Sequence, residues 1–262
     1  MRTRVTRALG AAAAAGALAA LGLSGAGATG AAASPAAAAR PAHPVTAYVA
    51  NAGSDTVTPI RTATNTAGKP IKVGIGPHAI AITPNGKTAY VANCCFDITT
   101  GDTVTPIRTA TNTAGKPIKV GRFPGAIAIT PNGKTAYVAS DGPDTVTPIR
   151  TATNTAGKAI KVGRGPAAIA ITPDGKTAYV ANIFSDTVTP IRTATNTAGK
   201  PIRVGKPIKN GGIACIAITP NGKTAYVTIA TPGPVTPIRT AANTALKAIK
   251  VGSFPMAIAI TR

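Results

Sequence analysis

The sequence is poor in the residues from which most catalytic sites are built. Its 262 residues include no tryptophan, two histidines, three cysteines and seven acidic residues. Catalytic zinc sites with three histidines or an HExxH motif are excluded, because His43 falls in a linker and only His78 remains for the folded part. No GxSxG motif surrounds a serine, so a serine nucleophile is not indicated either. We therefore expect no catalytic residues, no metal and no cofactor.

Negative charge is scarce, and the imbalance of charge is large. Lysine and arginine number 28 against 7 acidic residues, which gives a formal net charge of +21 at pH 7. A field of this sign attracts nucleic acid, anionic wall polymers or acidic lipid. The apolar fraction of 44% still suffices for a buried core, which argues against a disordered chain.

The first 39 residues are predicted to be a signal peptide and an alanine-rich leader. Residues 1–7 are basic and residues 8–28 form an apolar stretch without a charge, the pattern of secretory signals. Residues 40–45 are a linker, and residues 46–262 are the folded part. We expect a secreted, extracellular protein that can associate with the cell wall and that has no membrane span after signal cleavage. An uncleaved membrane anchor is the alternative.

Five copies of one unit fill the folded part. The segment TAYV recurs with its tyrosine at spacings of 42 and 47 residues, and it holds every tyrosine of the chain: Tyr48, Tyr90, Tyr137, Tyr179 and Tyr226. Each unit contains four short runs typical of β-strands, joined by turns such as PNGK. A repeat of this length and content is typical of a propeller blade. The sequence thus predicts an all-β fold, a β-propeller of five four-stranded blades.

The ends of the array are related to each other. The array opens at Thr46 with TAYVAN and closes at Thr261 after AIAIT, so the PNGK turn that joins these two segments elsewhere is missing between them. The first strand can therefore pair beside the last. We expect ring closure between the N-terminal and C-terminal strands, with no open edge, in a monomer. Closure across an oligomer is the alternative.

The repeat resembles the YVTN family of β-propeller proteins. The likeness rests on Tyr90-Val91-Ala92-Asn93 and on the PNGK, DTVTPI, TATNT and VGxxP elements, and it extends from Val45 to Thr261. Members differ in their roles, so the resemblance implies a fold and no particular ligand. All five units differ from the family at Pro59 and Arg61 and their equivalents, where valine and an acidic residue are usual. Because proline cannot donate to a strand ladder, we expect a bulge or interruption there.

Propeller topology sorts the loops between two faces. Connections between second and third strands, and between blades, emerge on one side, which carries both five-residue insertions and all four phenylalanines. We predict that a ligand is bound there by His78, Phe96, Arg122, Phe123, Arg164, Phe184, Lys206, Lys209 and Phe254. The alternative is that the phenylalanines before Pro124 and Pro255 fill gaps between blades.

The hairpin turns within each blade emerge on the opposite side, and their lysines repeat from blade to blade. We predict that they form a ring that binds a polyanion through summed charge. Its members are Lys69, Lys87, Lys116, Lys134, Lys158, Lys176, Lys200, Lys223 and Lys247. The alternative is a solvated surface without a ligand.

Aspartate recurs at one position just before the third strand: Asp55, Asp102, Asp144 and Asp186. There an aspartate side chain can accept backbone N–H groups in a turn, so we interpret these residues as structural. Calcium bound by Asp97 with Asp102, or by Asp141 with Asp144, is a weaker alternative because no calcium-loop pattern is present. A disulfide from Cys94 or Cys95 to Cys215 is a further hypothesis, since export favours oxidation.

These features favour one functional hypothesis over two alternatives. The main hypothesis is a secreted binding or scaffold module, not an enzyme, that contacts an anionic polymer such as a wall polymer or nucleic acid, or a surface protein. One alternative is an extracellular propeller enzyme, a hydrolase or lactonase, with a site at the channel mouth; His78 is the only histidine that its loops supply. The other is a structural wall component without a specific ligand.

Overall fold

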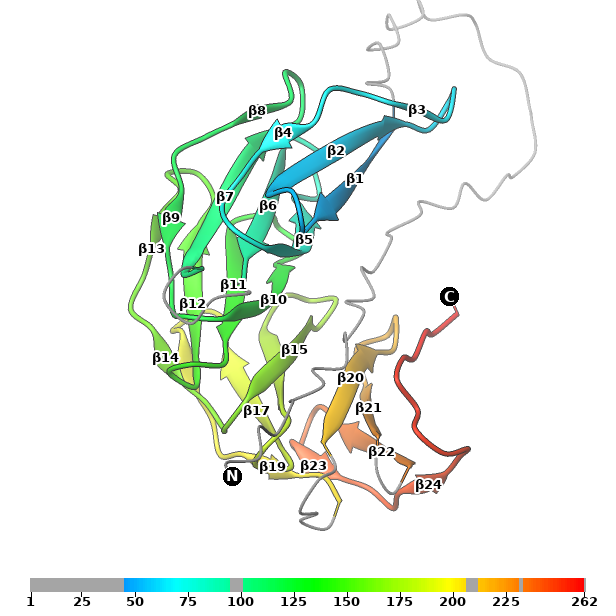
Figure 1. Ribbon diagram of the computed structural model, residues 1–262. Helices are drawn as coiled ribbons and strands as arrows, with labels where there is room; N and C mark the ends of the chain where they lie inside the picture. Colours follow the sequence, from blue (N-terminus) through cyan, green and yellow to red (C-terminus); the bar gives the residue numbers. More distant parts are fainter. Residues whose placement is uncertain (1–44, 95–100, 206–211, 231–232, 262) are drawn as a thin grey trace, which may run out of the picture.

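The computed structural model describes residues 45–94, 101–205, 212–230 and 233–261. The predicted all-β fold is confirmed, since these residues form strands and turns and contain no helix. Five antiparallel sheets follow one another along the chain, and they stand side by side in an arc (Figure 1). The predicted signal peptide lies outside the described residues. Nowhere in these four ranges is there a helix long and apolar enough to cross a membrane.

The second sheet shows the plan of a complete blade. Its strands are β5 (Pro77–Ile82), β6 (Thr88–Asn93) and β7 (Thr103–Arg108), followed by the short outer pieces β8 (Thr113–Ala114) and β9 (Ile118–Lys119). The turn between β5 and β6 is held by Asn85, whose Oδ1 accepts hydrogen bonds from the Thr83 hydroxyl at 2.7 Å and the Lys87 N–H at 3.0 Å. Gly86 has a φ of 69°, which the Asn-Gly pair supplies without strain.

The other sheets repeat this plan with the bounds that follow. The third has β10 (Pro124–Ile129), β11 (Thr135–Ser140), β12 (Thr145–Arg150), β13 (Thr155–Ala156) and β14 (Ile160–Lys161). The fourth has β15 (Pro166–Ile171), β16 (Thr177–Asn182), β17 (Thr187–Arg192), β18 (Thr197–Ala198) and β19 (Ile202–Arg203). The fifth has β20 (Ile213–Ile218), β21 (Thr224–Ile229), β22 (Pro234–Arg239), β23 (Thr244–Ala245) and β24 (Ile249–Lys250). The first has only β1 (Thr46–Asn51), β2 (Thr56–Arg61), β3 (Thr66–Ala67) and β4 (Ile71–Lys72).

The repeated proline interrupts the outer strand and leaves the third strand whole. Pro59 lies in the middle of β2, where it opposes Tyr48 of β1 in an unbroken register. Its carbonyl accepts a hydrogen bond from the Gly68 N–H at 2.7 Å, so its missing N–H faces the outer edge as well. The outer strand is consequently split into β3 and β4 at this level. The expected interruption is therefore present, one strand further out than the proline itself.

The core lies between neighbouring sheets. One cluster joins Tyr90, Val104 and Ile118 of the second sheet to Val138 and Ile149 of the third. Equivalent clusters join the first sheet to the second, the third to the fourth and the fourth to the fifth. Both faces of each inner sheet are covered in this way, which explains why their second strands are apolar on both faces.

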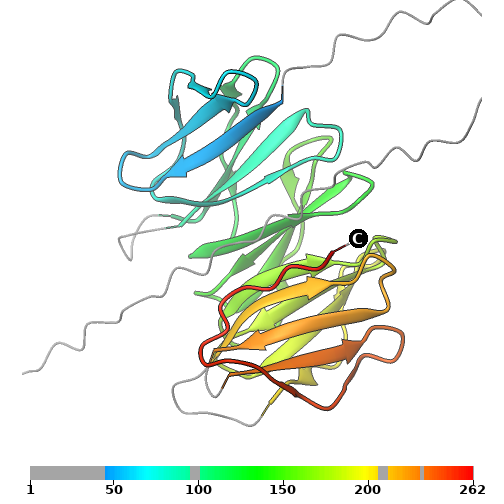
Figure 2. The ribbon, with the colours of Figure 1, turned by 90° about the vertical axis from the view of Figure 1, so that its right-hand side faces the viewer.

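The predicted ring closure between the terminal strands is wrong for this structure. β1 pairs only with β2, and residues 251–261 form no strand, although they contain the AIAIT segment expected beside β1. The first and last sheets lie at opposite ends of the arc, and residues 251–261 are the red coil that follows β24 (Figures 1 and 2). The orientation of each sheet is set by packing on its neighbour, and four such interfaces do not bring the fifth sheet round to the first.

Candidate functional site

The loops that join second to third strands and blade to blade form one end of the blades, which we call the loop face. His78 lies there, exposed, at the start of β5. A register shift between Pro77 and Ala79 makes it the extra residue of a β-bulge. Bulges re-aim side chains at the rims of sheets, and the same position holds glycine or alanine in the next three sheets. His78 is therefore the one polar side chain that the innermost strands present at this position.

Arg122 and Phe123 form a pair in the connection from the second sheet to the third. The Arg122 guanidinium carbon lies 5.8 Å from the centre of the Phe123 ring, within cation–π range. Phe123 has a φ of 59°, which is unusual for a residue with a side chain. A Cβ built on Gly142 would lie 3.1 Å from both residues, so the pair packs closely on the next loop.

Arg164 and Phe184 lie together one blade further on. The Phe184 N–H donates a hydrogen bond to the Arg164 carbonyl at 3.0 Å, and the Arg164 N–H donates to the Ser185 hydroxyl at 3.1 Å. The Phe184 ring packs on Gly165 but stays 54% exposed. This site also combines an arginine and a phenylalanine. Here the phenylalanine comes from the loop between second and third strands, whereas Phe123 comes from the connection between blades, next to Arg122.

The remaining predicted loop-face residues are not gathered with these pairs. Phe254 follows the last sheet and is 65% exposed. Phe96, Lys206 and Lys209 lie outside the described residues. The structure thus gives two separate arginine–phenylalanine pairs and a lone histidine, and it does not bring the predicted set into one pocket.

The opposite end of the blades, which we call the basic face, is more uniform. Its turn lysines are exposed: Lys87, Lys134, Lys176 and Lys223. The structure adds arginines that end the third strands, all exposed: Arg61, Arg108, Arg150, Arg192 and Arg239. Arg108 pairs with Thr88, the residue after Lys87, and the Thr109 N–H donates to the Lys87 carbonyl at 3.1 Å. The sequence shows these arginines only as a repeated departure from the family pattern, and the register of the strands places them beside the turn lysines.

The other predicted lysines do not belong to the basic face. They fall between the two outer strand pieces of each blade: Lys69, Lys116, Lys158, Lys200 and Lys247. Lys69 follows Gly68, whose N–H is bonded to Pro59 in the middle of β2, so it lies midway along the outer edge. The expectation of one lysine ring is corrected for these five residues, because the split outer strand carries them to the circumference.

Acidic residues are divided unequally between the two faces. Five of the six described aspartates fall in loops between second and third strands, Asp97 lies outside the described residues, and the sequence has no glutamate. Asp174, in a turn of the basic face, is the exception. Its Oδ2 lies 3.9 Å from Nζ of Lys176. Hydrogen bonds from the Thr172 hydroxyl and the Lys176 N–H lower the pKa of Asp174, so it is charged at neutral pH.

The recurring aspartates of the loop face have structural contacts. Asp55 Oδ1 accepts a hydrogen bond from the Gly76 N–H at 2.8 Å, and Asp144 Oδ1 accepts one from the Gly165 N–H at 2.9 Å. Each bond ties a loop to the connection leading into the next blade. Asp102 instead lies 3.8 Å from Lys119 Nζ. In the four described ranges, no three His, Cys or acidic side chains are grouped closely enough to hold a metal ion. Cys215 is a buried free thiol, and Cys95 lies outside the described residues.

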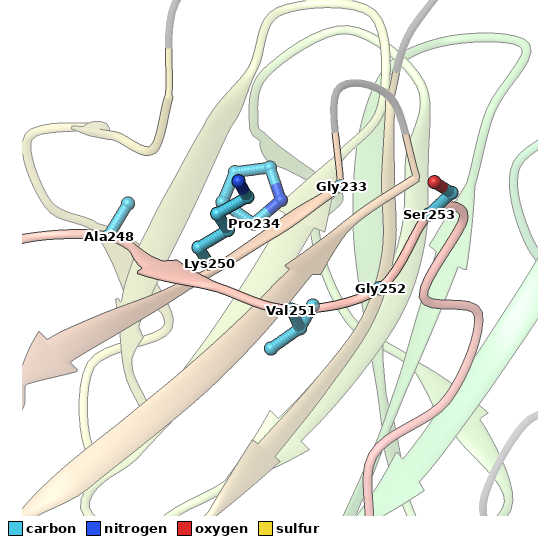
Figure 3. Close-up of a pocket in the computed structure, with 7 residues that line it drawn as sticks. All are labelled: Gly233, Pro234, Ala248, Lys250, Val251, Gly252 and Ser253. Atoms are coloured by element: carbon cyan, nitrogen blue, oxygen red, sulfur yellow. The ribbon is translucent and has the colours of Figure 1, made fainter.

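A hollow of about 350 Å³ lies on the last sheet and not at the inner strands (Figure 3). It is lined by Gly233, Pro234, Ala248, Lys250, Val251, Gly252 and Ser253. Lys250 is its only charged side chain, and no acid or histidine lines it. The hollow therefore offers no set of groups for acid–base catalysis.

Comparison with known proteins agrees with the arrangement of sheets. The protein family described as "Lactonase, 7-bladed beta-propeller" matches residues 41–218. The chain belongs to this family. The described residues of this member of the Lactonase family form five sheets, against the seven blades of the family description. Among curated proteins, none matches the chain.

Two solved structures are similar to this Lactonase-family chain. Hydrazine synthase of Kuenenia stuttgartiensis matches with a TM-score of 0.60 and 28% identity, over 68% of this chain and 50% of the other. A functionally unknown protein from Desulfotomaculum acetoxidans DSM 771 matches with a TM-score of 0.61 and 19% identity, over 77% of this chain and 67% of the other. The chain thus spans half the length of the hydrazine synthase chain, and the second likeness concerns the fold alone.

Proposed function

We propose that this protein is a propeller module that binds an anionic polymer through its basic face. The observation that carries the proposal is that the described residues at one end of the blades include nine exposed cationic side chains and a single carboxylate, Asp174. The predicted secretion signal favours a wall polymer as the natural ligand. Single-stranded nucleic acid presents the same chemistry of spaced phosphates and serves as a probe.

The cations of the basic face are available to a ligand. Among the described residues, the ion pairs are Lys119 with Asp102 and Lys176 with Asp174, and only the second lies on this face. The other cations there are not neutralised by a neighbouring carboxylate, so their fields add. They repeat once per blade, which suits a polymer with a regular spacing of charge. The repeat shows no motif that recognises individual bases, so we expect binding without sequence preference.

Binding across a salt series tests the proposal. For the chain from Arg40 onward, we expect affinity for single-stranded DNA and for a purified anionic wall polymer to fall steeply as salt increases. The slope of log K against log salt is about −0.7 for each single-strand phosphate contacted. In a variant with Lys87, Lys134, Lys176 and Lys223 changed to Gln, this slope should become less steep by the contribution of about four phosphate contacts.

The outer-edge lysines supply a matched control. A variant with Lys69, Lys116, Lys158 and Lys200 changed to Gln removes the same charge from the circumference and should change the slope far less. Equal losses in the two variants would mean that net charge, and not the basic face, drives binding. Absence of binding to both polymers at physiological salt would overturn the proposal.

The family match favours a second candidate, hydrolysis of a lactone at the loop face. Such a reaction needs a group that takes a proton from water and donors that stabilise the oxyanion. His78, exposed on its bulge at the end of an innermost strand, is the residue with the chemistry for the first task. Turnover of a lactone panel that is lost in His78→Gln, with binding of polyanions unchanged, would establish this function. Turnover that persists in His78→Gln would exclude this role of His78.

A further inference from the structure

Apolar side chains are exposed at the two ends of the arc. At the N-terminal end these are Val45 at 73%, Val49 at 43% and Ile82 at 40% exposure. At the C-terminal end they are Leu246, Ile249, Val251, Phe254 and Met256, between 39% and 65% exposed. The other exposed large apolar residues, Ile75 and Phe184, belong to loops of the loop face. The two ends therefore form apolar surfaces that the internal sheets do not have.

The exposed surfaces at the two ends of the arc correspond to the two sides of an interface between neighbouring sheets. In the interface between the second and third sheets, Ile118 of the outer strand is 6% exposed and Val138 of the facing strand is 0% exposed. Their equivalents at the ends are Ile249, which is 46% exposed, and Val49, which is 43% exposed. The last sheet thus presents the side that a following sheet would cover, and the first sheet presents the side that a preceding sheet would cover.

Two contacts that join neighbouring sheets elsewhere, one a hydrogen bond and one a close packing contact, are missing at the same place. Each of the first four repeat tyrosines donates its hydroxyl to an asparagine one sheet further along, as Tyr179 does to Asn243 at 2.6 Å. Tyr226 has no following sheet, and the matching asparagine of the first sheet is Asn65, whose φ of 52° equals that of Asn112. Likewise, a Cβ on Gly74 would lie 2.6 Å from Asn93, whereas one on Gly252 would meet nothing within 4 Å. The matching residue for Gly252 is Asn51.

The free edge of β1 has a matching strand in the sequence. Inside the second sheet, Ala79 pairs with Ala92, Ile80 with Val91 and Ala81 with Tyr90. The segment 255–261, PMAIAIT, repeats the sequence of such an innermost strand, and β1 repeats that of its partner. Transfer of the register places Ala257 opposite Ala50, Ile258 opposite Val49 and Ala259 opposite Tyr48. In the structure Ala257 and Ala259 are exposed and without a strand partner.

We propose that two copies of this chain associate head to tail, with residues 255–261 of one copy added to the edge of β1 of the other. A second copy is the occupant because the arc holds the two ends of one chain apart (Figures 1 and 2). Surfaces that match each other but lie at different places on one molecule produce heterologous contacts, which form a ring or a longer chain of copies. The added strand also covers Ile82 and removes the open edge of the first sheet.

Disulfide trapping tests the register and the identity of the partner at once. The test uses a chain with Cys94→Ala, Cys95→Ala and Cys215→Ala, of which the first and third place the alanine found in other repeats. Ala50→Cys and Ala257→Cys are then added. After mild oxidation we expect species of two or more chain masses on a non-reducing gel. A cross-linked single chain would overturn the proposal in favour of closure within one chain, and no cross-link would overturn it altogether.

Light scattering on the chain without added cysteines gives an independent measurement. We expect a mass of two or more chains that decreases on dilution. Val49→Glu places a charge on a side chain already exposed in the single copy, so it should leave the fold intact and give a single-chain mass. Phe184→Glu alters another exposed side chain, away from the ends, and should leave the mass unchanged. A single-chain mass for the unaltered protein at high concentration would overturn the proposal.

Discussion

The hydroxyl of Tyr90 donates a hydrogen bond of 2.6 Å to Oδ1 of Asn154, which lies in the next sheet along the chain. The same bond joins Tyr48 to Asn112, Tyr137 to Asn196 and Tyr179 to Asn243, at 2.6 to 2.7 Å. Each of these asparagines has a positive φ near 52°, a conformation that asparagine tolerates better than most residues. In each of the first four repeats, one tyrosine thus packs between two sheets and fixes the turn of the following sheet.

Removal of one of these hydroxyls should destabilise the fold modestly. Tyr137→Phe loses the bond to Asn196 and should lower the free energy of unfolding by about 1 kcal/mol. Tyr226→Phe is the matched control, since the Tyr226 hydroxyl makes no hydrogen bond within the described residues, and it should change stability little in the single copy. Urea unfolding at low protein concentration measures both. Equal losses would show that Tyr226 has found a partner within one chain.

Stability should fall at alkaline pH through these tyrosines. Burial raises the pKa of Tyr137 to about 12 from an ordinary value of 10.0, and burial with the nearby Asp174 carboxylate does the same for Tyr179. Because the folded pKa lies above the unfolded one, this contribution is fully present below pH 10 and is lost as pH rises to about 12. Urea unfolding across this range should show a shallower decline for Tyr137→Phe with Tyr179→Phe. An unchanged decline would contradict the assignment.

Asp174→Asn should leave stability unchanged and strengthen polyanion binding. Asn85, Asn132 and Asn221 fill the same turn position in other sheets and accept the same two hydrogen bonds, so the substitution keeps the turn within about 0.5 kcal/mol. It also removes the one carboxylate of the basic face. Thermal unfolding and DNA binding at fixed salt check the two parts. Weaker binding would show that Asp174 itself contacts the ligand.

Asp144 should tolerate loss of its charge but not of its acceptor. Its Oδ1 accepts the Gly165 N–H, and its φ is 55°. Asp144→Asn keeps the acceptor and the tolerance of positive φ, and should cost less than about 0.5 kcal/mol. Asp144→Ala loses both and should cost about 2 kcal/mol. Urea unfolding of the two variants separates these effects. If Asn were as damaging as Ala, the negative charge would be the property that matters.

Much of the basic face could be predicted from the sequence. Lys87 and its equivalents follow an Asn-Gly or Asp-Gly pair between two β-type runs, and such a turn has one geometry. The position of Arg108 beside Lys87 could not be predicted in the same way, because it depends on the register of β6 against β7. The position of Lys69 on the outer edge could not be predicted for a related reason. The sequence shows a proline in the third strand, but not that its missing N–H faces the outer strand and splits it.

The contacts of the loop face could be predicted only in part from the repeat. Arg122 and Phe123 lie side by side in the sequence, and their contact of 5.8 Å needs only local geometry. Arg164 and Phe184 lie twenty residues apart, and their loops meet only because strand pairing returns the chain to the same end of the blade. Position in a repeat therefore predicted the face, and the contacts within it depended on the pairing of the strands.

The sequence by itself determined the all-β fold, the five repeats, the turns and the excess of positive charge. These follow from interactions between residues close in the chain, such as the Asn85 turn and the pairing of β5 with β6, and from composition. Only the tertiary structure decided that the first and last sheets stay apart. The angle between sheets depends on how side chains such as Tyr90, Ile118 and Val138 pack across an interface, and this packing recurs at four interfaces. No pattern of residue types along the chain records that angle.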